Sequence, residues 1–154
     1  MKIRPALHAD LPAMNEVTMA SKASWGYSAA QLEIWRENLT TSADSLAWPT
    51  LVAEVDGRIV AMAQCDPTRR PWMLVACWVA PALMHRGIGA ALLREIASMA
   101  RNAGHDELHI DADPNAEAFY LRQGAIRFGA IPAAIEGEPD RMRPQLRLPL
   151  GAAR

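Results

Sequence analysis

The sequence predicts an α/β (α+β) fold whose strands and helices follow the order β-α-α-β-β-β-α-β-α-β-β. Residues 73–79 are apolar at nearly every position, which is typical of a central strand buried on both faces. The helical stretch that follows, 88–103, places apolar side chains on one face. Asp56-Gly57 separates two apolar runs and is a strong signal for a two-residue hairpin turn.

A short strand and two helices are expected at the start of the chain. The strand covers residues 2–4, and Asp10 is expected to cap a first helix that runs to about residue 24. Ser28, with Gln31 three residues later, has the signature of a capping box and opens the second helix. The buried stripe expected on this second helix consists of Leu32, Trp35 and Leu39.

The rest of the chain alternates between strands and helices. A long helix is expected from Gly87 to Gly104, where a C-cap glycine belongs. Another is expected to start at Asp113-Pro114, a capping carboxylate followed by proline at the first helical position. The remaining strands are expected at 51–55, 58–65, 73–79, 107–112, 125–130 and 145–150.

The composition indicates one ordinary globular domain. The chain has 154 residues, of which 51% are hydrophobic and 21% charged, and the formal net charge is −1. One domain spanning 1–154 is expected, because neither a linker nor a repeat interrupts the pattern. The charge balance has no basic excess, so no nucleic-acid partner is expected. No apolar run reaches about 18 residues, so no membrane span is expected and the predicted location is cytoplasmic.

The cysteines and histidines do not suggest a metal site. Cys65 and Cys77 are the two cysteines, and they form no Cys-x-x-Cys pair. A cysteine on a buried strand usually behaves as a small apolar side chain, so Cys77 is not expected to be a nucleophile. His105 and His109 flank the start of a strand instead of sharing a helix face, and no metal is expected.

The segment after strand 73–79 carries the signal for a cofactor. It reads Val79-Ala80-Pro81, then Met84-His85-Arg86-Gly87-Ile88-Gly89, and it enters an amphipathic helix. The first amides of a helix have no internal acceptor and the helix dipole is positive there, so such a loop can bind a pyrophosphate. Ala90-Ala91 excludes a P-loop, and Leu92 stands where a Rossmann motif needs a small residue, which disfavours a nicotinamide-dependent oxidoreductase.

This segment resembles the pyrophosphate loop of GNAT acetyltransferases, which reads Arg/Gln-x-x-Gly-x-Gly/Ala after Val-x-Pro. Met84 departs from the first position of that pattern. A second segment, 111–125, is similar to the family's next strand–helix unit, Asn-x-x-Ala-x-x-Phe-Tyr-x-x-x-Gly, with only the alanine displaced. Residues 21–27 also resemble a segment of some small bacterial members. The resemblance covers nearly the whole chain.

The resemblance implies a mixed, mostly antiparallel sheet of about six to seven strands flanked by about four helices, with CoA between two splayed central strands. It implies an N-acetyltransferase that moves an acetyl group from acetyl-CoA to a primary amine of a small molecule or peptide by direct attack. The protein is expected to be a monomer or a homodimer. The residues implied in CoA binding are Trp78, Val79, Met84, His85, Arg86, Gly87, Ile88, Gly89, Ala90, Asn115, Phe119 and Tyr120.

The resemblance also implies catalytic roles for a backbone amide and a tyrosine. The N–H near Val79 would bind the carbonyl oxygen as charge builds on it. Tyr120 would protonate the departing thiolate, since a tyrosine pKa near 10, above a thiol pKa of ~8.5, leaves the hydroxyl protonated and able to donate at pH 7. In the family, the segment that joins the first two helices lies over the acceptor. Trp25 and Tyr27 are therefore expected to line the acceptor pocket, and Trp35 is expected to belong to the core.

The general base is not identified by the sequence. Strand 73–79 has no carboxylate, and Asp66, Asp111 and Glu54 are candidates only through a water molecule. Alternatively, the amine arrives already deprotonated. Because the base is missing, a non-catalytic acyl-CoA-binding sensor on the same fold is the alternative interpretation.

Overall fold

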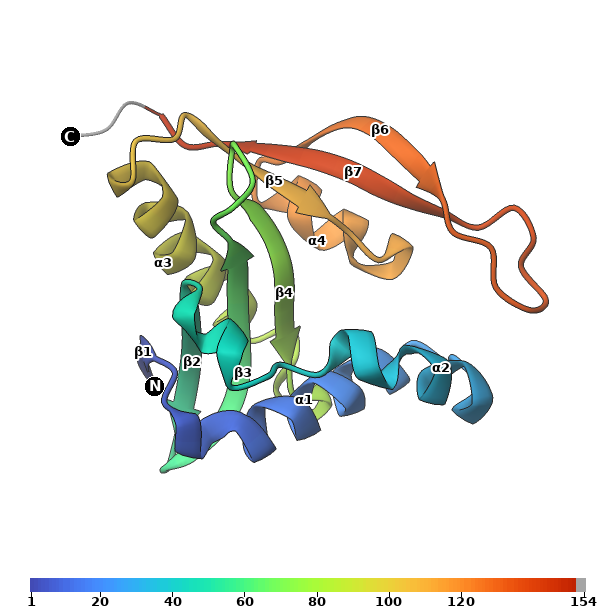
Figure 1. Cartoon of the computed structure of the whole chain (residues 1–154), viewed down its shortest axis with the longest axis horizontal. Helices are drawn as coiled ribbons and strands as arrows, with labels where there is room; N and C mark the ends of the chain where they lie inside the picture. Colours follow the sequence, from blue (N-terminus) through green and yellow to red (C-terminus); the bar gives the residue numbers. More distant parts are fainter. Residues whose placement is uncertain (152–154) are drawn as a thin grey trace. The chain divides into compact units, whose positions relative to one another are not determined.

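The structure, a computed structural model, describes residues 1–151 and confirms the predicted order of strands and helices (Figure 1). The helices are α1 (Leu11–Ala23), α2 (Ala29–Leu39), α3 (Ile88–Asn102) and α4 (Glu117–Arg122). Short 3-10 turns lie at His8–Asp10, Asp44–Ala47, Pro81–Leu83 and Pro114–Ala116. The strands are β1 (Lys2–Pro5), β2 (Thr50–Val55), β3 (Arg58–Asp66), β4 (Met73–Val79), β5 (Glu107–Asp111), β6 (Ile126–Pro132) and β7 (Met142–Pro149).

The strands form one seven-stranded sheet in the order β1-β2-β3-β4-β5-β7-β6. β4 and β5 are parallel, with Met73 opposite His109 and Leu74 opposite Ile110. The pairs β1–β2, β2–β3, β5–β7 and β6–β7 are antiparallel. The sheet is therefore mixed and mostly antiparallel, as predicted.

The backbone divides into two compact units, which are described separately. The first consists of Met1–Cys65 and Ala76–Ile96, and so holds β1 to β3, the end of β4, α1, α2 and most of α3. The second consists of Asp66–Val75 and the chain from Ala97 on, with the start of β4, the end of α3, α4 and β5 to β7. The organisation of the chain as one domain stays a prediction.

In the first unit, the hairpin between β2 and β3 has the predicted turn. Asp56 and Gly57 have φ values of +52° and +75°, the two positive angles that a type I′ turn requires. Val55 pairs with Arg58 across this two-residue turn. Met14 of α1 packs between the strands against Val52 and Met62, and all three side chains are fully buried.

Asp10 does not cap α1 with its side chain, contrary to the prediction. Its carboxylate accepts hydrogen bonds from the Leu7 amide at 2.7 Å and from the Arg4 guanidinium at 2.7 and 2.9 Å. Arg4 also donates to Glu54 at 2.7 Å. An arginine within reach outcompetes the helix amides for the carboxylate, and the cluster lowers the pKa of Asp10 while joining β1, β2 and the entrance of α1.

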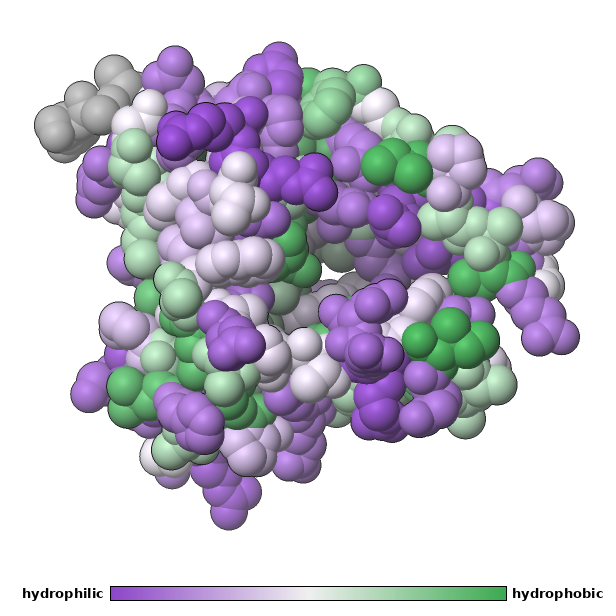
Figure 2. Space-filling model, in the orientation of Figure 1, coloured by the Kyte–Doolittle hydropathy of each residue, from purple (hydrophilic) through white to green (hydrophobic). Residues whose placement is uncertain are grey.

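The second helix begins as predicted but is less buried than predicted. The Ser28 hydroxyl accepts a hydrogen bond from the Gln31 amide at 3.1 Å. No residue of α2 is fully buried, and the expected stripe, including Trp35, is only half-buried. Figure 1 shows α2 beside α1, and Figure 2 shows polar and apolar residues interspersed over the face in view.

β4 is central in the strand order, but it is not buried on both faces. Leu74 is its one fully buried residue, and Val75 is 44% exposed. A central strand needs hydrogen-bond partners on both edges, whereas burial of both faces needs a covering layer on each side. An apolar sequence does not distinguish these two requirements.

In the second unit, the strand and helix boundaries shift by a few residues. β7 begins at Met142, three residues before the predicted start, because Arg143 and Pro144 still pair with β6. The helix predicted at Asp113-Pro114 opens with a 3-10 turn before α4 begins. At the end of α3, Gly104 has φ +97° and the His105 amide donates to the carbonyl of Ala100, which confirms the predicted glycine cap.

Replacing Arg4 tests whether its ion cluster stabilises the first unit. Arg4→Met should lower the free energy of unfolding by about 1–2 kcal/mol, because it leaves two neighbouring carboxylates without their shared donor. Because the pKa of Asp10 is lowered, this contribution is present at pH 7 and disappears as the pH falls through that folded-state pKa. Urea unfolding at pH 7, and then at a series of lower pH values, measures both effects.

Arg36→Met is the matched control for this measurement. Arg36 also forms an ion pair, with Glu33 at 2.9 Å, but the two side chains are 54% and 70% exposed. Removing such a pair should cost less than about 0.5 kcal/mol. Equal losses in the two variants would show that the Arg4 cluster has no special role.

Candidate active site

The loop between β4 and α3 is built by two left-handed residues. His85 has φ +63° and Gly87 has φ +82°, and His85, Arg86 and Gly87 are all exposed. A side chain at Gly87 would meet no atom within 4 Å, so the backbone angle and not crowding accounts for the glycine. The loop therefore presents its backbone to solvent where α3 begins.

The N-terminus of α3 directly follows this loop. The Ala91 amide makes the first helical hydrogen bond, to the carbonyl of Gly87 at 3.0 Å. The amides of Ile88, Gly89 and Ala90 precede that bond and have no acceptor within the helix. The helix dipole of a 15-residue helix adds positive potential at this point, which suits an anion such as a pyrophosphate.

The end of β4 is held against its neighbour in the sheet. The Ala80 amide donates to the carbonyl of Val60 on β3 at 2.8 Å. This bond fixes the exit of the strand just after Trp78 and Val79, two residues that the sequence assigned to the site. All the predicted residues from Trp78 to Ala90 thus lie in the first unit, on one strand–loop–helix segment.

Four aromatic rings gather beside this strand end. Trp25 lies 5.7 Å from Trp78 between ring centroids, and Tyr27 lies 4.8 Å from Trp35 in an edge-to-face arrangement. We call these four residues the aromatic cage. The cage brings the two predicted acceptor residues to Trp78, and it also includes Trp35, which was expected to belong to the core.

The cage surrounds Lys22, a residue that the sequence analysis did not single out. Lys22 lies near the end of α1 and is only 7% exposed. A signal was present in the sequence: Lys22 follows Met14 and Thr18 at intervals of four, so it falls on the buried stripe of α1. A lysine on such a stripe, next to a Trp-Gly-Tyr segment, indicates a buried cation with aromatic neighbours.

In the second unit, Asp113 positions Asn115. One carboxylate oxygen of Asp113 accepts hydrogen bonds from the backbone N–H and the side-chain amide of Asn115, at 2.8 and 2.9 Å. The other oxygen accepts from Arg141 at 3.3 Å, and these two charged side chains are each only 4% exposed. Asp113 was predicted to cap a helix, and it caps the 3-10 turn in which Asn115 lies.

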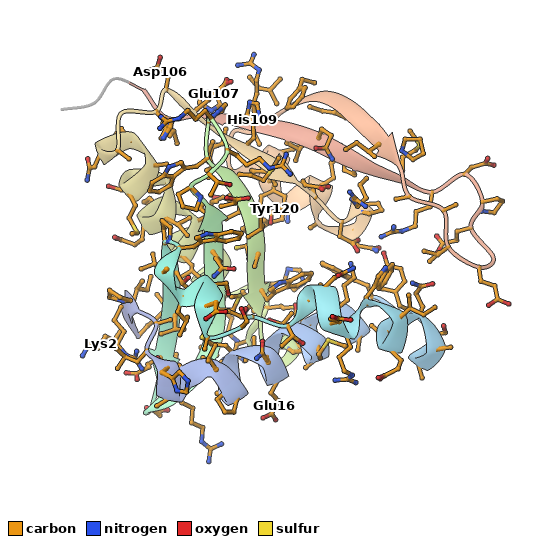
Figure 3. The ribbon with its side chains drawn as sticks, in the orientation of Figure 1. Lys2, Glu16, Asp106, Glu107, His109 and Tyr120 are labelled. Carbon is orange, nitrogen blue, oxygen red and sulfur yellow. The ribbon has the colours of Figure 1, made fainter. Side chains whose placement is uncertain are left out.

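Tyr120 lies on α4 in the same unit and is 6% exposed (Figure 3). Its ring packs edge-to-face against Phe119 at 5.2 Å between centroids. Asn115, Phe119 and Tyr120 therefore belong to one turn-and-helix segment, as the sequence predicted.

The three carboxylates considered as a general base all make structural contacts. Asp66 accepts from the amide and hydroxyl of Thr68 at 2.9 and 2.6 Å and so stabilises a turn. Asp111 accepts two hydrogen bonds from Arg143, at 2.9 and 3.0 Å, and the pair raises the pKa of Arg143. Glu54 is bound by Arg4. Each of these carboxylates therefore has a structural role in holding a turn or a strand.

His109, which was considered as a metal ligand, has a carboxylate partner on its own strand. Figure 3 shows Glu107 and His109 on β5, and the two side chains interact at 3.0 Å. Within residues 1–151, no group of three or more His, Cys, Asp or Glu residues could hold a metal ion. In that same range, no helix is long and apolar enough to cross a membrane.

The fold, a mostly antiparallel sheet with a glycine loop and a long helix after its central strand, is similar to that of known acetyltransferases. The model described as the acetyltransferase (GNAT) family matches residues 12–125. The chain therefore belongs to the GNAT family of acetyltransferases. No curated protein matches the sequence.

Several solved structures share the fold of this chain. The paia N-acetyltransferase from Thermoplasma acidophilum in complex with coenzyme A has a TM-score of 0.76 and 17% identity, over 96% of this chain and 98% of that one. A ribosomal-protein-alanine N-acetyltransferase from Brucella melitensis has a TM-score of 0.70 and 23% identity, over 97% and 99%. A GNAT family acetyltransferase from the same organism, in complex with acetyl-CoA, has a TM-score of 0.66 and 23% identity, over 99% and 90%.

Cys77 provides a test of direct transfer. Desolvation raises the pKa of its thiol to about 12, so the reactive thiolate is essentially absent at pH 7 to 9. Cys77→Ala should therefore keep acetyl transfer within about threefold of wild type, and no acetylated protein should accumulate during turnover. A loss of about 100-fold, together with an acetyl adduct on the wild-type protein by mass spectrometry, would instead indicate a cysteine nucleophile.

Proposed function

We propose that this chain transfers the acetyl group of acetyl-CoA to a primary amine of a small molecule or peptide, by direct attack of the amine on the thioester. The observation that carries this proposal is the loop between β4 and α3. Gly87 at φ +82° turns the chain so that an exposed backbone leads into the N-terminus of a 15-residue helix. That arrangement fits a pyrophosphate, and the amides from Gly87 to Ala90 would bind it.

Residues of both sequence motifs would make the other contacts with CoA. Met84, His85 and Arg86 belong to the same loop, and Trp78 precedes it. Asn115 would contact the pantetheine arm, with its orientation set by Asp113. Phe119 would pack beside that arm. Coenzyme A or acetyl-CoA is bound in two of the structural neighbours, which supports the choice of co-substrate.

Two groups of the chain are proposed to act on the reacting atoms. Acetyl-CoA supplies an activated acetyl group as a thioester. The Val79 amide donates a hydrogen bond to the carbonyl oxygen, where charge develops as the amine attacks. The Tyr120 hydroxyl donates a proton to the departing thiolate. The amine loses a proton to solvent before it attacks. After the attack, the C–S bond breaks and the nitrogen gives up one further proton, which returns through solvent to the Tyr120 oxygen, so the amide and the CoA thiol are both formed neutral.

The proposal also covers the acceptor, the cellular location and the oligomeric state. One structural neighbour is named for the alanine of a ribosomal protein, so a peptide N-terminus stands beside small amines as a candidate acceptor. We place Trp25 and Tyr27 at the acceptor. Because acetyl-CoA is the donor, we place the enzyme in the cytoplasm. We also propose that it is a monomer or a homodimer.

A non-catalytic acyl-CoA sensor is the second candidate function. The observation that favours it is that Asp66, Asp111 and Glu54 are all engaged in structural hydrogen bonds, so none is suited to act as a base. The two functions predict the same cofactor binding and differ only in turnover.

Turnover and cofactor binding can be tested together with Gly89→Glu. The wild type should release CoA thiol from acetyl-CoA with at least one member of a panel of amino acids, polyamines, aminoglycosides and peptides. Gly89→Glu should weaken CoA binding at least about tenfold by calorimetry, because it adds bulk and negative charge at the helix N-terminus. Gly89 lies inside α3, so a side chain causes less strain there than at the left-handed Gly87.

Gly89→Ala is the matched control, because it adds a methyl group without charge and should retain the fold. CoA binding without turnover of any amine would establish the sensor. Unchanged CoA affinity in Gly89→Glu would contradict the assignment of the loop.

Removing the Tyr120 hydroxyl tests the proposed proton donor. Tyr120→Phe keeps the ring that packs on Phe119 and should lower kcat by about 10²–10⁴-fold with little change in CoA affinity. Leu121→Ala, at an exposed position of the same helix, controls for disturbance of α4. A wild-type kcat in Tyr120→Phe, measured where chemistry limits the rate, would rule out the role.

A further inference from the structure

The aromatic cage already contains a cation. The Lys22 ammonium lies 4.4 Å from the ring centroid of Trp35, 5.2 Å from Tyr27, 5.7 Å from Trp78 and 5.9 Å from Trp25. All four distances are within the range of about 6 Å over which a ring face attracts a positive charge. Cages of this kind bind ammonium ligands in other proteins, and here the chain itself supplies the ligand.

The cage is built from four different parts of the first unit. Lys22 comes from the end of α1, Trp25 and Tyr27 from the connection to α2, Trp35 from α2, and Trp78 from β4. A charge that is 93% removed from solvent needs compensation, and ring faces provide part of it. Because each ring contacts the same ammonium, the lysine holds the connection and α2 against the strand end.

The place of the cage connects it with the acceptor. Trp78 immediately precedes Val79, whose amide we propose as the donor to the thioester carbonyl. The rings nearest to the Val79 amide already make contacts within the protein. Trp25 and Trp78 contact each other, and Trp78 also packs on the core around Met14. A second ammonium carried by an acceptor would therefore find the favourable ring positions taken by Lys22.

We propose that Lys22 is a resident cation that fills the aromatic cage and so determines acceptor specificity. The favoured acceptors are amines whose only positive charge is on the nitrogen to be acetylated, such as monoamines, amino acids and peptide N-termini. Diamines and polyamines carry a further ammonium that the filled cage does not accommodate. The effect on acceptor choice rests on the proposed acetyl transfer, but the filled cage itself can be tested without turnover.

The first measurement tests the cage by restoring the missing cation. Lys22→Ala should lower the melting temperature, and 1-butylammonium should raise it again by at least about 2 °C more than in the wild type. Equal concentrations of 1-butanol, which has the same carbon chain but no charge, should not do so. If butylammonium has no larger effect on Lys22→Ala than on the wild type, the resident-cation role is wrong.

The second measurement compares butylamine with 1,4-diaminobutane, which differ only by the second amine. The wild type should prefer the monoamine at least about tenfold in kcat/KM, and Lys22→Ala should reduce that preference at least about tenfold. Lys22→Arg, which keeps the charge, should retain the preference. A wild type that uses both amines equally, or a Lys22→Ala preference equal to that of the wild type, would overturn the specificity role.

These two measurements separate the inference from the proposed function. Rescue by butylammonium without turnover of any amine would show that the cage is correct and acetyl transfer is wrong. Turnover of an amine without rescue by butylammonium would show that acetyl transfer is correct and that the resident-cation role of Lys22 is wrong. If Lys22→Ala does not fold, Lys22→Met removes the charge while filling most of the volume, and the acceptor preference is measured on that variant.

Discussion

The chain leaves β4 and enters α3 through a turn whose geometry depends on the backbone angle of Gly87. At φ +82° an L side chain is strained, even though the space around this residue is open. The turn sets the direction of the first amides of α3, and those amides are the proposed anion site for the cofactor. The exposed positions of His85 and Arg86 follow from the same turn. A small change in one backbone angle would therefore move the whole proposed phosphate site.

Arginines hold two of the three carboxylates considered as a general base, Glu54 and Asp111. Arg4 binds Asp10 and Glu54 in the first unit, and Arg143 binds Asp111 in the second. These contacts stabilise the strands on which Glu54 and Asp111 lie. In the proposed mechanism, an amine that reaches the site without its proton attacks the thioester directly, and the backbone of Val79 and the hydroxyl of Tyr120 are the groups proposed to act on it.

The segment that runs from the end of α1 through α2 is held at both ends by specific contacts. At one end, the aromatic rings converge on Lys22. At the other, Asn15 and Thr41 exchange two hydrogen bonds, at 2.8 and 3.1 Å. The helix between them has no fully buried residue, so these contacts and not a large apolar interface position it. A segment held in this way can shape an acceptor pocket while most of its surface stays polar.

The sequence by itself determined the order of the elements, the type I′ turn at Asp56-Gly57 and the glycine loop before α3. Each of these depends on local backbone preferences, which neighbouring residues specify. It also identified Asn115, Phe119 and Tyr120 as one segment, because motif spacing on a turn and helix is local. The partner of Asp10, the half-buried faces of α2 and β4, and the cation inside the aromatic cage were decided only by the tertiary structure. Those features join residues that are far apart in the chain, such as Arg4 with Glu54 and Lys22 with Trp78, and no local preference specifies which distant side chain will satisfy a given charge.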